Sequence, residues 1–382
     1  MKRKKIILTI CACACVVLAG VVLLATFWQP KHTHQLNDSK TYHVCNDEVY
    51  YTRACTKGCE IRFDTKASFY DVISSVTAQD SIVLDENIEL AEEILIKSFI
   101  GQGEQAQAMD IKINLDLNGH AITTNIEDYS NNAMFMINAN LGNVELNIKN
   151  GELKSEDLLY IFRFKNTRYV GQNIKINIDG VDCTTTGVQT TPLYAHNECY
   201  NVVVNATDSR FISKPVSTDK GKYGVGAFIN SDSTFNFDRC YFEGGDGVYV
   251  RSGNIEFKNC RFVNSGLVAH TIQSGEKFSA VGAAFVADNH ATNSGISTFQ
   301  VKIIDCSMEC LSSFKTIYVI ETSENGATLG VNQNSVINVQ SCKFTHNPTA
   351  LTIPQYSLVK YPNGVAPTNQ GSMLWACGLD LD

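Results

Sequence analysis

The chain of 382 residues has little charge and little proline: charged residues make up 18 % of it, and it contains 7 prolines against 26 glycines. Globular domains usually carry about a quarter charged residues, so this composition favours a β-rich exported protein. An excess of basic residues is also missing. The 31 basic residues include Lys2, Arg3, Lys4 and Lys5, so 27 remain against 39 acidic residues in the rest of the chain. Because an acidic body repels phosphate groups, we expect no nucleic-acid partner.

Paired Cys-x-x-Cys motifs, which mark structural zinc sites, are absent although the chain has 14 cysteines. Near His43, the cysteines Cys45, Cys55 and Cys59 follow the pattern His-x-Cys…Cys-x-x-x-Cys. We expect disulfide chemistry for these three cysteines, because the segment is predicted to lie outside the cell. A metal set and free thiols are the alternatives, and Cys377 is a candidate partner for the odd thiol. No metal and no cofactor is predicted.

The N-terminal region lacks charge over a long stretch, because residues 6–28 contain no charged side chain after the basic residues 2–5. At ~1.5 Å per residue, such a helix crosses a hydrocarbon core of ~30 Å. We expect an uncleaved signal anchor at 6–28 that binds the cell membrane as a single pass. The preceding positive charge places the N-terminus in the cytoplasm and the rest outside. A cleaved signal peptide is the alternative, although Leu24 to Trp28 offers no A-x-A-like cleavage site.

Long helical periodicity is absent from about residue 111 to the end. Before that point, Phe69, Val72, Ile73 and Val76 share one face of a short amphipathic helix predicted over 68–77, with Ser68 as its N-cap. After it, strands alternate with corners rich in Asn, Asp, Gly and Ser. One frame recurs there: apolar, any, apolar, any, any, small, any, apolar. Its six copies begin at Leu146, Val204, Phe235, Ile255, Val301 and Ile337.

A repeated strand–corner–strand unit predicts a solenoid. Its small positions are Gly151, Ser209, Cys240, Cys260, Cys306 and Cys342. Stacked coils place each copy over the last at ~4.7–4.9 Å, so we expect an internal ladder of buried small side chains rather than disulfides or a metal cluster. The longest interval between small positions, 58 residues, divides if Cys183 belongs to the series, and Cys306 with Cys310 is a separate disulfide candidate. Asn150, Asp208, Asn259 and Asp305 precede the small residue in four copies, where Asx residues tolerate a tight corner.

The segment Ile113-Asn-Leu-Asp-Leu-Asn-Gly-His-Ala-Ile122 resembles the LDLNGHTI signature of bacterial surface proteins with a pectin-lyase-like right-handed β-helix. Asp80 to Leu84 is similar to the DSIVL-like strand that precedes the signature in those proteins. The segments Gly244 to Val250 and Ile255 to Phe262 look like their later rungs. The resemblance covers about 63–345. It implies a fold but no single activity, because this superfamily contains lyases, hydrolases, adhesins and inert scaffolds.

The predicted fold class is therefore all-β, a right-handed parallel β-helix with a short N-terminal capping helix, preceded by one transmembrane helix. The expected divisions are a cytoplasmic basic end (1–5), the anchor (6–28), a stalk and Cys-containing segment (29–62), the β-helix (63–353) and a C-terminal tail that caps the last turn (354–382).

Catalytic motifs of the superfamily's enzymes are mostly missing. We find no paired Asp residues on adjacent rungs for calcium, and of the hydrolase motifs NTD, GDD, GHG and RIK only Gly245-Asp246-Gly247 resembles part of one. Asp246 is the single weak candidate for a catalytic acid, and a corner Asp beside glycines is the alternative. Tyr194, Tyr200, Tyr241 and Tyr249 are candidates for stacking on sugar rings, with strand stabilisation as the alternative.

Two functions remain open at this point. The first is a non-catalytic β-helix displayed outside the cell membrane, acting in adhesion, in glycan binding or as an envelope scaffold. The second is a polysaccharide lyase or glycoside hydrolase that acts on acidic polysaccharide with a divergent active site.

Overall fold

The structure is a computed structural model, and it describes residues 35–45, 48–101, 105–139, 141–165, 174–195, 199–215, 224–265, 283–289, 291–292, 295–296, 298–310, 315–321, 335–346, 349–352 and 355–360. No helix among these residues is long and apolar enough to cross a membrane. The expected anchor at 6–28, the basic end, and Cys377 in the C-terminal tail lie outside the described residues.

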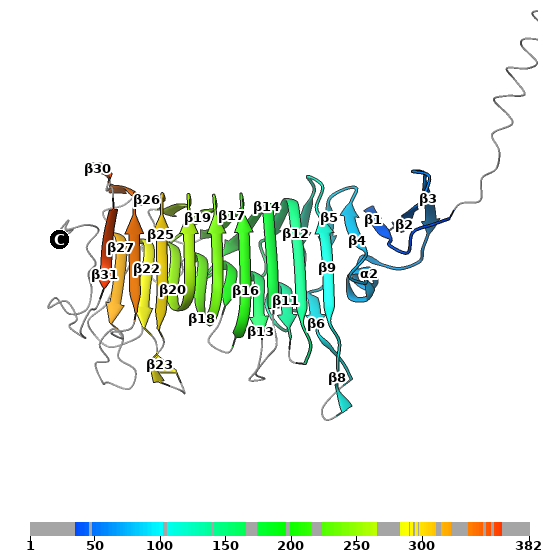
Figure 1. Ribbon diagram of the computed structural model, residues 1–382, viewed down its shortest axis with the longest axis horizontal. Coiled ribbons are helices and arrows are strands. Elements are labelled where there is room, and N and C mark those ends of the chain that lie inside the picture. The colour runs from blue at the N-terminus through cyan, green and yellow to red at the C-terminus, as the bar shows by residue number, and fades with distance from the viewer. Residues whose placement is uncertain are drawn as a thin grey trace, which may run out of the picture. The chain divides into compact units, whose positions relative to one another are not determined.

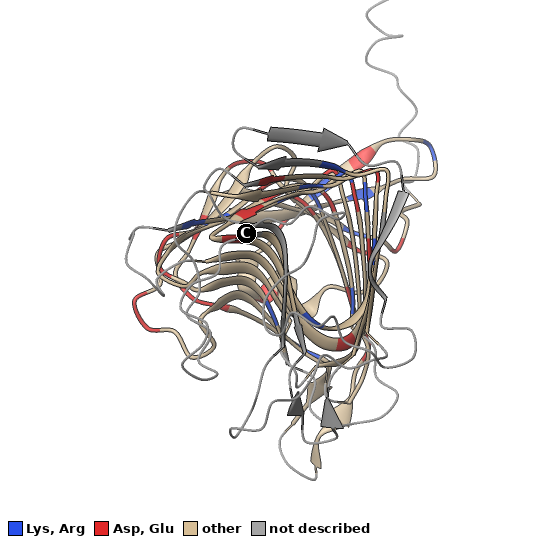
Figure 2. Cartoon of the chain, turned by 90° about the vertical axis from the view of Figure 1, so that its left-hand side faces the viewer, with Lys and Arg blue, Asp and Glu red and all other residues tan. Residues whose placement is uncertain are grey.

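The chain divides into two compact units. The smaller contains residues 1–38 and 53–61, and the larger contains residues 39–52 and 62–382. In the larger unit, parallel strands of successive turns lie side by side (Figure 1), and 27 strands join one continuous hydrogen-bonded system. Viewed along the coil, the strands of successive turns lie over one another (Figure 2). The larger unit is therefore a parallel β-helix, whose strands form three faces.

Face 1 consists of β4 (Ser81–Leu84), β9 (Ile111–Asp116), the first parts of β12 (Val144–Ser155) and β14 (Ile174–Gly187), β16 (Tyr200–Thr207), the second parts of β18 (Val225–Asp238) and β20 (Asp246–Lys258), β25 (Phe299–Ile304) and β28 (Val336–Gln340). Each strand pairs in parallel with its counterpart one turn later. Apolar residues alternate along these strands and point inward, so the residues between them line the outside.

Face 2 consists of β5 (Ile88–Leu90), β10 (Ala121–Thr124), the second parts of β12 and β14, β17 (Arg210–Pro215), β19 (Tyr241–Gly244), β21 (Arg261–Asn264), β26 (Ser307–Cys310) and β29 (Lys343–His346). Face 3 consists of β6 (Ile94–Lys97), β11 (Ala133–Asn138), β13 (Tyr160–Lys165), β15 (Thr191–Ala195), the first parts of β18 and β20, β22 (Ala283–Asn289) and β27 (Lys315–Glu321).

Other strands pair with the two ends of the coil. β1 (Thr41–Cys45) adds in parallel to β4, and β2 (Glu48–Ala54) pairs antiparallel with β1. These strands, with the start of β3 (Glu60–Asp64), occupy the range expected to be a stalk and Cys-containing segment. At the other end, β30 (Thr349–Thr352) and β31 (Gln355–Lys360) pair antiparallel with β29 and β28. Two short hairpins, β7–β8 (Phe99–Ile100, Gln107–Ala108) and β23–β24 (Ala291–Thr292, Gly295–Ile296), complete the described elements.

The short helix near the start of the coil is confirmed as α2 (Phe69–Ser75). Ser68 accepts a hydrogen bond from the backbone N–H of Asp71, whose side chain accepts one from the backbone N–H of Ser68. This capping box satisfies two N–H groups that the first helical turn leaves open. Phe69, Val72 and Ile73 are buried, as the spacing predicts.

At the turn from face 1 to face 2, one residue in each complete copy of the frame has the left-handed backbone conformation, with a positive φ angle. The φ angles of Asn150, Gly180, Asp208, Arg239, Asn259, Asp305 and Ser341 lie between 49° and 62°. The corner role predicted for the Asx residues is confirmed, and the same geometry also accepts arginine and serine. At Gly180 the following residue, Val181, takes the small position, because Val181 pairs with Gly151. Cys183 therefore does not belong to the ladder. It lies on face 2, where it pairs with Leu153 of β12 and Phe211 of β17.

The predicted thiol ladder is present inside the coil. Cys240, Cys260, Cys306 and Cys342 are free and buried, and the backbone N–H of Cys260 donates to Cys306 Sγ at 3.2 Å. Burial raises the thiol pKa of Cys260 and Cys306. These thiols act as small apolar side chains in the core. Cys306 is a free thiol, so the disulfide considered between Cys306 and Cys310 is not formed.

Rings stack along the interior beside the thiols. Phe211, Phe242 and Phe262 lie in parallel at centroid distances of 5.3 and 5.5 Å, and Phe237 stacks on Phe257 at 5.1 Å. All five rings are at most 2 % exposed. The repeat therefore places like residues over like, which lets each turn bury its apolar face on the next.

Candidate functional site

Asp246, the weak candidate for a catalytic acid, lies inside the coil. It begins β20, pairs with Val225 of the previous turn, and has no exposed surface. Glycines surround it: an added Cβ at Gly244 would come within 2.6 Å of the Asp246 carbonyl oxygen. The position is thus tightly packed, as expected for a corner Asp beside glycines.

Two of the candidate tyrosines, Tyr194 and Tyr249, lie on face 3 and contact Phe228 between them. The Tyr194 ring stacks between Tyr160 at 4.3 Å and Phe228 at 5.3 Å, so both of its ring faces are covered. Tyr249 has no exposed surface, and the guanidinium of Arg251 lies 5.1 Å from its ring centroid. Burial raises the pKa of Tyr194. In this arrangement the rings stabilise neighbouring turns and leave no open ring face for a sugar.

The other two tyrosines lie apart from this pair. On face 2, Tyr241 stands between the guanidinium groups of Arg210 at 5.2 Å and Arg261 at 5.5 Å, and its hydroxyl donates to Glu243 Oε2 at 2.6 Å. Tyr200, the first residue of β16, is 41 % exposed. The four tyrosines are therefore spread over three faces and do not form one binding site.

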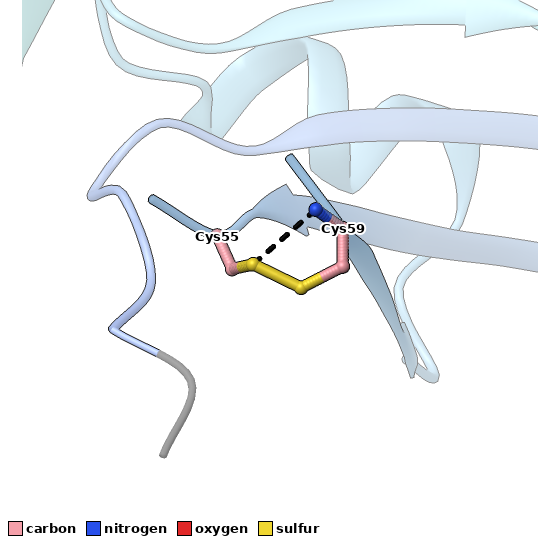
Figure 3. Close-up of a disulfide and its surroundings, with 2 residues drawn as sticks. All are labelled: Cys55 and Cys59. Carbon is pink, nitrogen blue, oxygen red and sulfur yellow. Dashed lines mark hydrogen bonds between the residues drawn. A yellow bond between two sulfur atoms is a disulfide. The ribbon is translucent and has the colours of Figure 1, made fainter. Parts of the chain in front are cut away.

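The three disulfide candidates separate into a pair and a single thiol. In the smaller unit, Cys55 and Cys59 form a disulfide, and the backbone N–H of Cys59 donates to Cys55 Sγ at 3.3 Å (Figure 3). In the larger unit, Cys45 is a free thiol on β1. A hydrogen bond to the Glu86 carboxylate raises the pKa of Cys45. Among the residues that the structure describes, no three His, Cys, Asp or Glu side chains are placed to hold a metal ion.

A continuous polar feature runs along the outside of face 1. Asn114, Asn147, Asn177, Asn205 and Asn236 occupy the same position in successive turns. Each amide Nδ2 donates to the Oδ1 of the asparagine one turn before it, at distances of 2.8, 2.5, 2.9 and 2.9 Å. We call this row the amide ladder. The first amide, that of Asn114, donates to the backbone oxygen of Asp80 at 2.9 Å.

Charged side chains stand on both sides of the amide ladder. On one side, Lys112 and Lys175 lie 3.4 and 3.8 Å from the Glu145 carboxylate. On the other side, Lys149 lies 3.0 Å from Asp116, and Thr207 donates to Asp179 at 2.6 Å. Figure 2 marks the positions of Lys and Arg in blue and of Asp and Glu in red along the strands. The ladder therefore forms a neutral floor between two rows of mixed charge.

The surface is hollowed along this floor. A depression of about 410 Å³ is lined by Ser81, Asn114, Asp116, Asn147, Lys149, Asn177 and Asp179. A second, of about 280 Å³, lies farther along the same face and is lined by Asn205, Thr207, Asn236, Asp238, Glu256 and Lys258. A third, of about 370 Å³, follows Lys112, Glu145 and Lys175. All three open on face 1, which makes this face the best candidate for a binding surface.

The carboxyl group of Asp116 on this surface is held in its ionised form. Burial acts to raise the pKa of Asp116, but hydrogen bonds from Lys149, Asn118 and Asn150 outweigh it, so the pKa is lowered. A general acid needs a raised carboxyl pKa to keep its proton at neutral pH. Asp116 is therefore suited to bind and orient rather than to protonate a leaving group.

Sequence reasoning missed the amide ladder although its signal lies within the repeated frame. In five turns, one asparagine stands between the two leading apolar residues, as in Leu146-Asn-Ile148 and Phe235-Asn-Phe237. Since the apolar neighbours point inward, that asparagine must point outward. The stacking of turns then places the five amides in one row.

Comparisons with known proteins identify no family for this chain. No family model and no curated protein matches this chain. Among solved structures, the crystal structure of the Dettilon tailspike protein (gp208) is similar with a TM-score of 0.27 and 12 % identity, over 69 % of this chain and 43 % of that chain. The chain thus spans less than half the length of that protein. The parallel β-helix is established here by the strand register.

Proposed function

We propose that the protein is a membrane-anchored, extracytoplasmic and non-catalytic β-helix that binds a glycan along face 1. The coil is proposed to be right-handed and of the pectin-lyase-like kind, as the LDLNGHTI-like segment implies. Residues 6–28 would hold it in the cell membrane. The amide ladder on the floor of the depressions is the observation that carries this proposal.

The ladder suits hydroxyl groups because its amides keep hydrogen-bond donors and acceptors that the ladder bonds do not occupy. Asn177 donates one N–H to Asn147 and accepts one from Asn205. A side-chain amide offers two N–H groups and two lone pairs on oxygen, so one of each remains to face the depression. Sugar hydroxyls donate and accept at the same atom. Asn177 and Asn205, which each keep one spare donor and one spare acceptor, therefore complement a hydroxyl-rich chain.

The non-catalytic assignment is supported by the described carboxylates around the ladder. Asp116 is ion-paired with Lys149 and has a lowered pKa, and Asp179 accepts a hydrogen bond from Thr207. Glycoside hydrolysis by the usual route needs one protonated and one ionised carboxyl group across the scissile bond. The contacts of Asp116 therefore favour its ionised form rather than the protonated form of a general acid.

Binding is tested with the full-length chain in detergent. A glycan array identifies oligosaccharides that bind, and isothermal titration then compares the wild type with a double variant, Asn147→Ala with Asn177→Ala. The matched control is Asn254→Ala, which changes an exposed asparagine of face 1 outside the ladder. Circular dichroism checks that each variant is folded. We expect the ladder variant to lose most of its affinity and the control to keep it; equal affinities would refute the proposal.

The membrane part of the proposal is tested separately. In cells, the protein should stay with membranes after alkaline carbonate washing, and external protease should reach the β-helix. Release by carbonate, or protection of the β-helix in intact cells, would contradict an uncleaved anchor with the β-helix outside.

A further inference from the structure

We infer that the amide ladder selects uncharged glycan chains and excludes acidic ones, with the bound chain running along the axis of the coil. The inference rests on the proposed glycan binding and names the class of ligand. It departs from the acidic polysaccharide considered for the enzymatic alternative. Three properties of face 1 support it: the hydrogen-bonding pattern of the amides, the charge beside them and the spacing of the turns.

The hydrogen-bonding pattern disfavours carboxylates. Each ladder amide is a neutral group, and Asn177 and Asn205 each have one spare donor and one spare acceptor. A sugar hydroxyl satisfies both. An ionised carboxylate accepts hydrogen bonds but donates none, so it would leave the amide oxygen facing another oxygen. Losing a hydrogen bond and gaining that repulsion both weaken the binding of an acidic sugar.

The charge beside the ladder also disfavours anions. The wall of the first depression carries two carboxylates, Asp116 and Asp179, against one cation, Lys149. The wall of the second carries Asp238 and Glu256 against Lys258. The lining of the first depression thus has one excess negative charge, whereas in the second Asp238 is ion-paired with Arg239 and Glu256 with Lys302. Lys149 is already 3.0 Å from Asp116, so its charge is partly neutralised before any ligand carboxylate approaches.

The spacing sets the direction of the bound chain. The five ladder asparagines span four turns, which at ~4.8 Å per turn extend over ~19 Å. Both depressions beside the ladder follow the same line from Ser81 to Glu256. Across the strands, by contrast, the floor is one asparagine wide between the charged rows. A chain along the axis meets repeated identical amides, whereas a chain across it meets only one.

The selectivity is measured with the full-length protein and an array of hexasaccharides matched in length. Uncharged glucose, galactose, mannose and N-acetylglucosamine hexamers stand beside galacturonate and glucuronate hexamers. We expect at least one uncharged hexamer to bind about tenfold or more tightly than any uronate hexamer at low salt, where charge repulsion is strongest. A uronate that binds as tightly as the best uncharged hexamer would overturn the inference while leaving glycan binding itself intact.

Charge variants show whether the wall is the cause. The variant Asp116→Asn with Asp179→Asn removes two negative charges beside the ladder and should raise uronate affinity severalfold. The control Glu152→Gln with Asp182→Asn makes the same change in charge on face 2 and should leave the ratio unchanged. An unchanged ratio in the face 1 variant would overturn the role of the wall. If wild-type protein bound no hexamer of either class, glycan binding itself would fail, and the selectivity with it.

Discussion

The amide ladder makes a quantitative prediction about stability, because its members differ in how many ladder bonds they make. Asn177 has a ladder partner on each side, Asn147 at 2.5 Å and Asn205 at 2.9 Å. Asn236, at the end, has one such bond, to Asn205 at 2.9 Å. A net hydrogen bond contributes ~1 kcal/mol, so Asn177→Ala should lower the free energy of unfolding by ~2 kcal/mol and Asn236→Ala by ~1 kcal/mol.

The measurement is urea unfolding of the full-length chain in detergent, followed by far-ultraviolet circular dichroism. Asparagine and alanine are both poor strand formers, so the difference between the two variants reports mainly the lost bonds. Asn254→Ala on the same face should cost less than about 0.5 kcal/mol, as an exposed substitution does. Equal costs for Asn177→Ala and Asn236→Ala, or no cost for either, would show that the ladder bonds do not stabilise the coil.

Three further results are expected. Because Cys260 is buried and its thiol pKa is raised, iodoacetamide should modify it only after the protein unfolds. Mass spectrometry of the labelled peptides measures this, and rapid labelling of the native protein would contradict the ladder of buried thiols. Gly151→Ala should cost ~1–3 kcal/mol in the same unfolding assay, because the added Cβ would lie 2.4 Å from the His120 carbonyl oxygen. Burial acts to raise the pKa of Glu93, but hydrogen bonds from residues 130–133 outweigh it and lower the pKa. Its stabilising contribution is therefore present above the unfolded pKa of ~4.3 and is lost as the pH falls through the folded pKa. Glu93→Gln should thus reduce the loss of unfolding free energy at acidic pH, and an unchanged loss would refute this.

The coil itself was predictable because its signal is repeated. Each turn places apolar residues inward at the same spacing, and a left-handed corner recurs before the small residue. The corners at Asn150 and Asp208 were identified because Asx residues favour that conformation. Arg239 and Ser341 adopt the left-handed conformation as well, although their side chains do not favour it. The stacked turns above and below impose the conformation.

The strands at the start of the coil were not predictable from periodicity. β1 pairs with β4, which lies about forty residues later in the chain, and such long-range pairing leaves no local pattern in a polar segment. The contacts of the candidate tyrosines were hidden from the sequence for a related reason. Sequence shows that Tyr194 and Tyr249 alternate with buried residues, but it does not show that neighbouring turns place Tyr160 and Arg251 over their rings.

The amide ladder was within reach of the sequence, since its asparagines stand at one position of the repeated frame. What the sequence lacks is the register that joins Asn114 to Asn147 across 33 residues. Because the loops differ in length from turn to turn, the number of residues between successive asparagines varies and does not reveal that register. Only the structure shows that the amides lie one above another and that the surface is hollowed beside them.

The most direct test of the account is a crystal structure of the protein soaked with the uncharged hexasaccharide that binds it best. We predict density for the chain along face 1, parallel to the coil axis, with hydroxyl groups within hydrogen-bonding distance of the Asn147 and Asn177 amides. Density on face 3 beside Tyr194, or a chain lying across the strands of face 1, would contradict it.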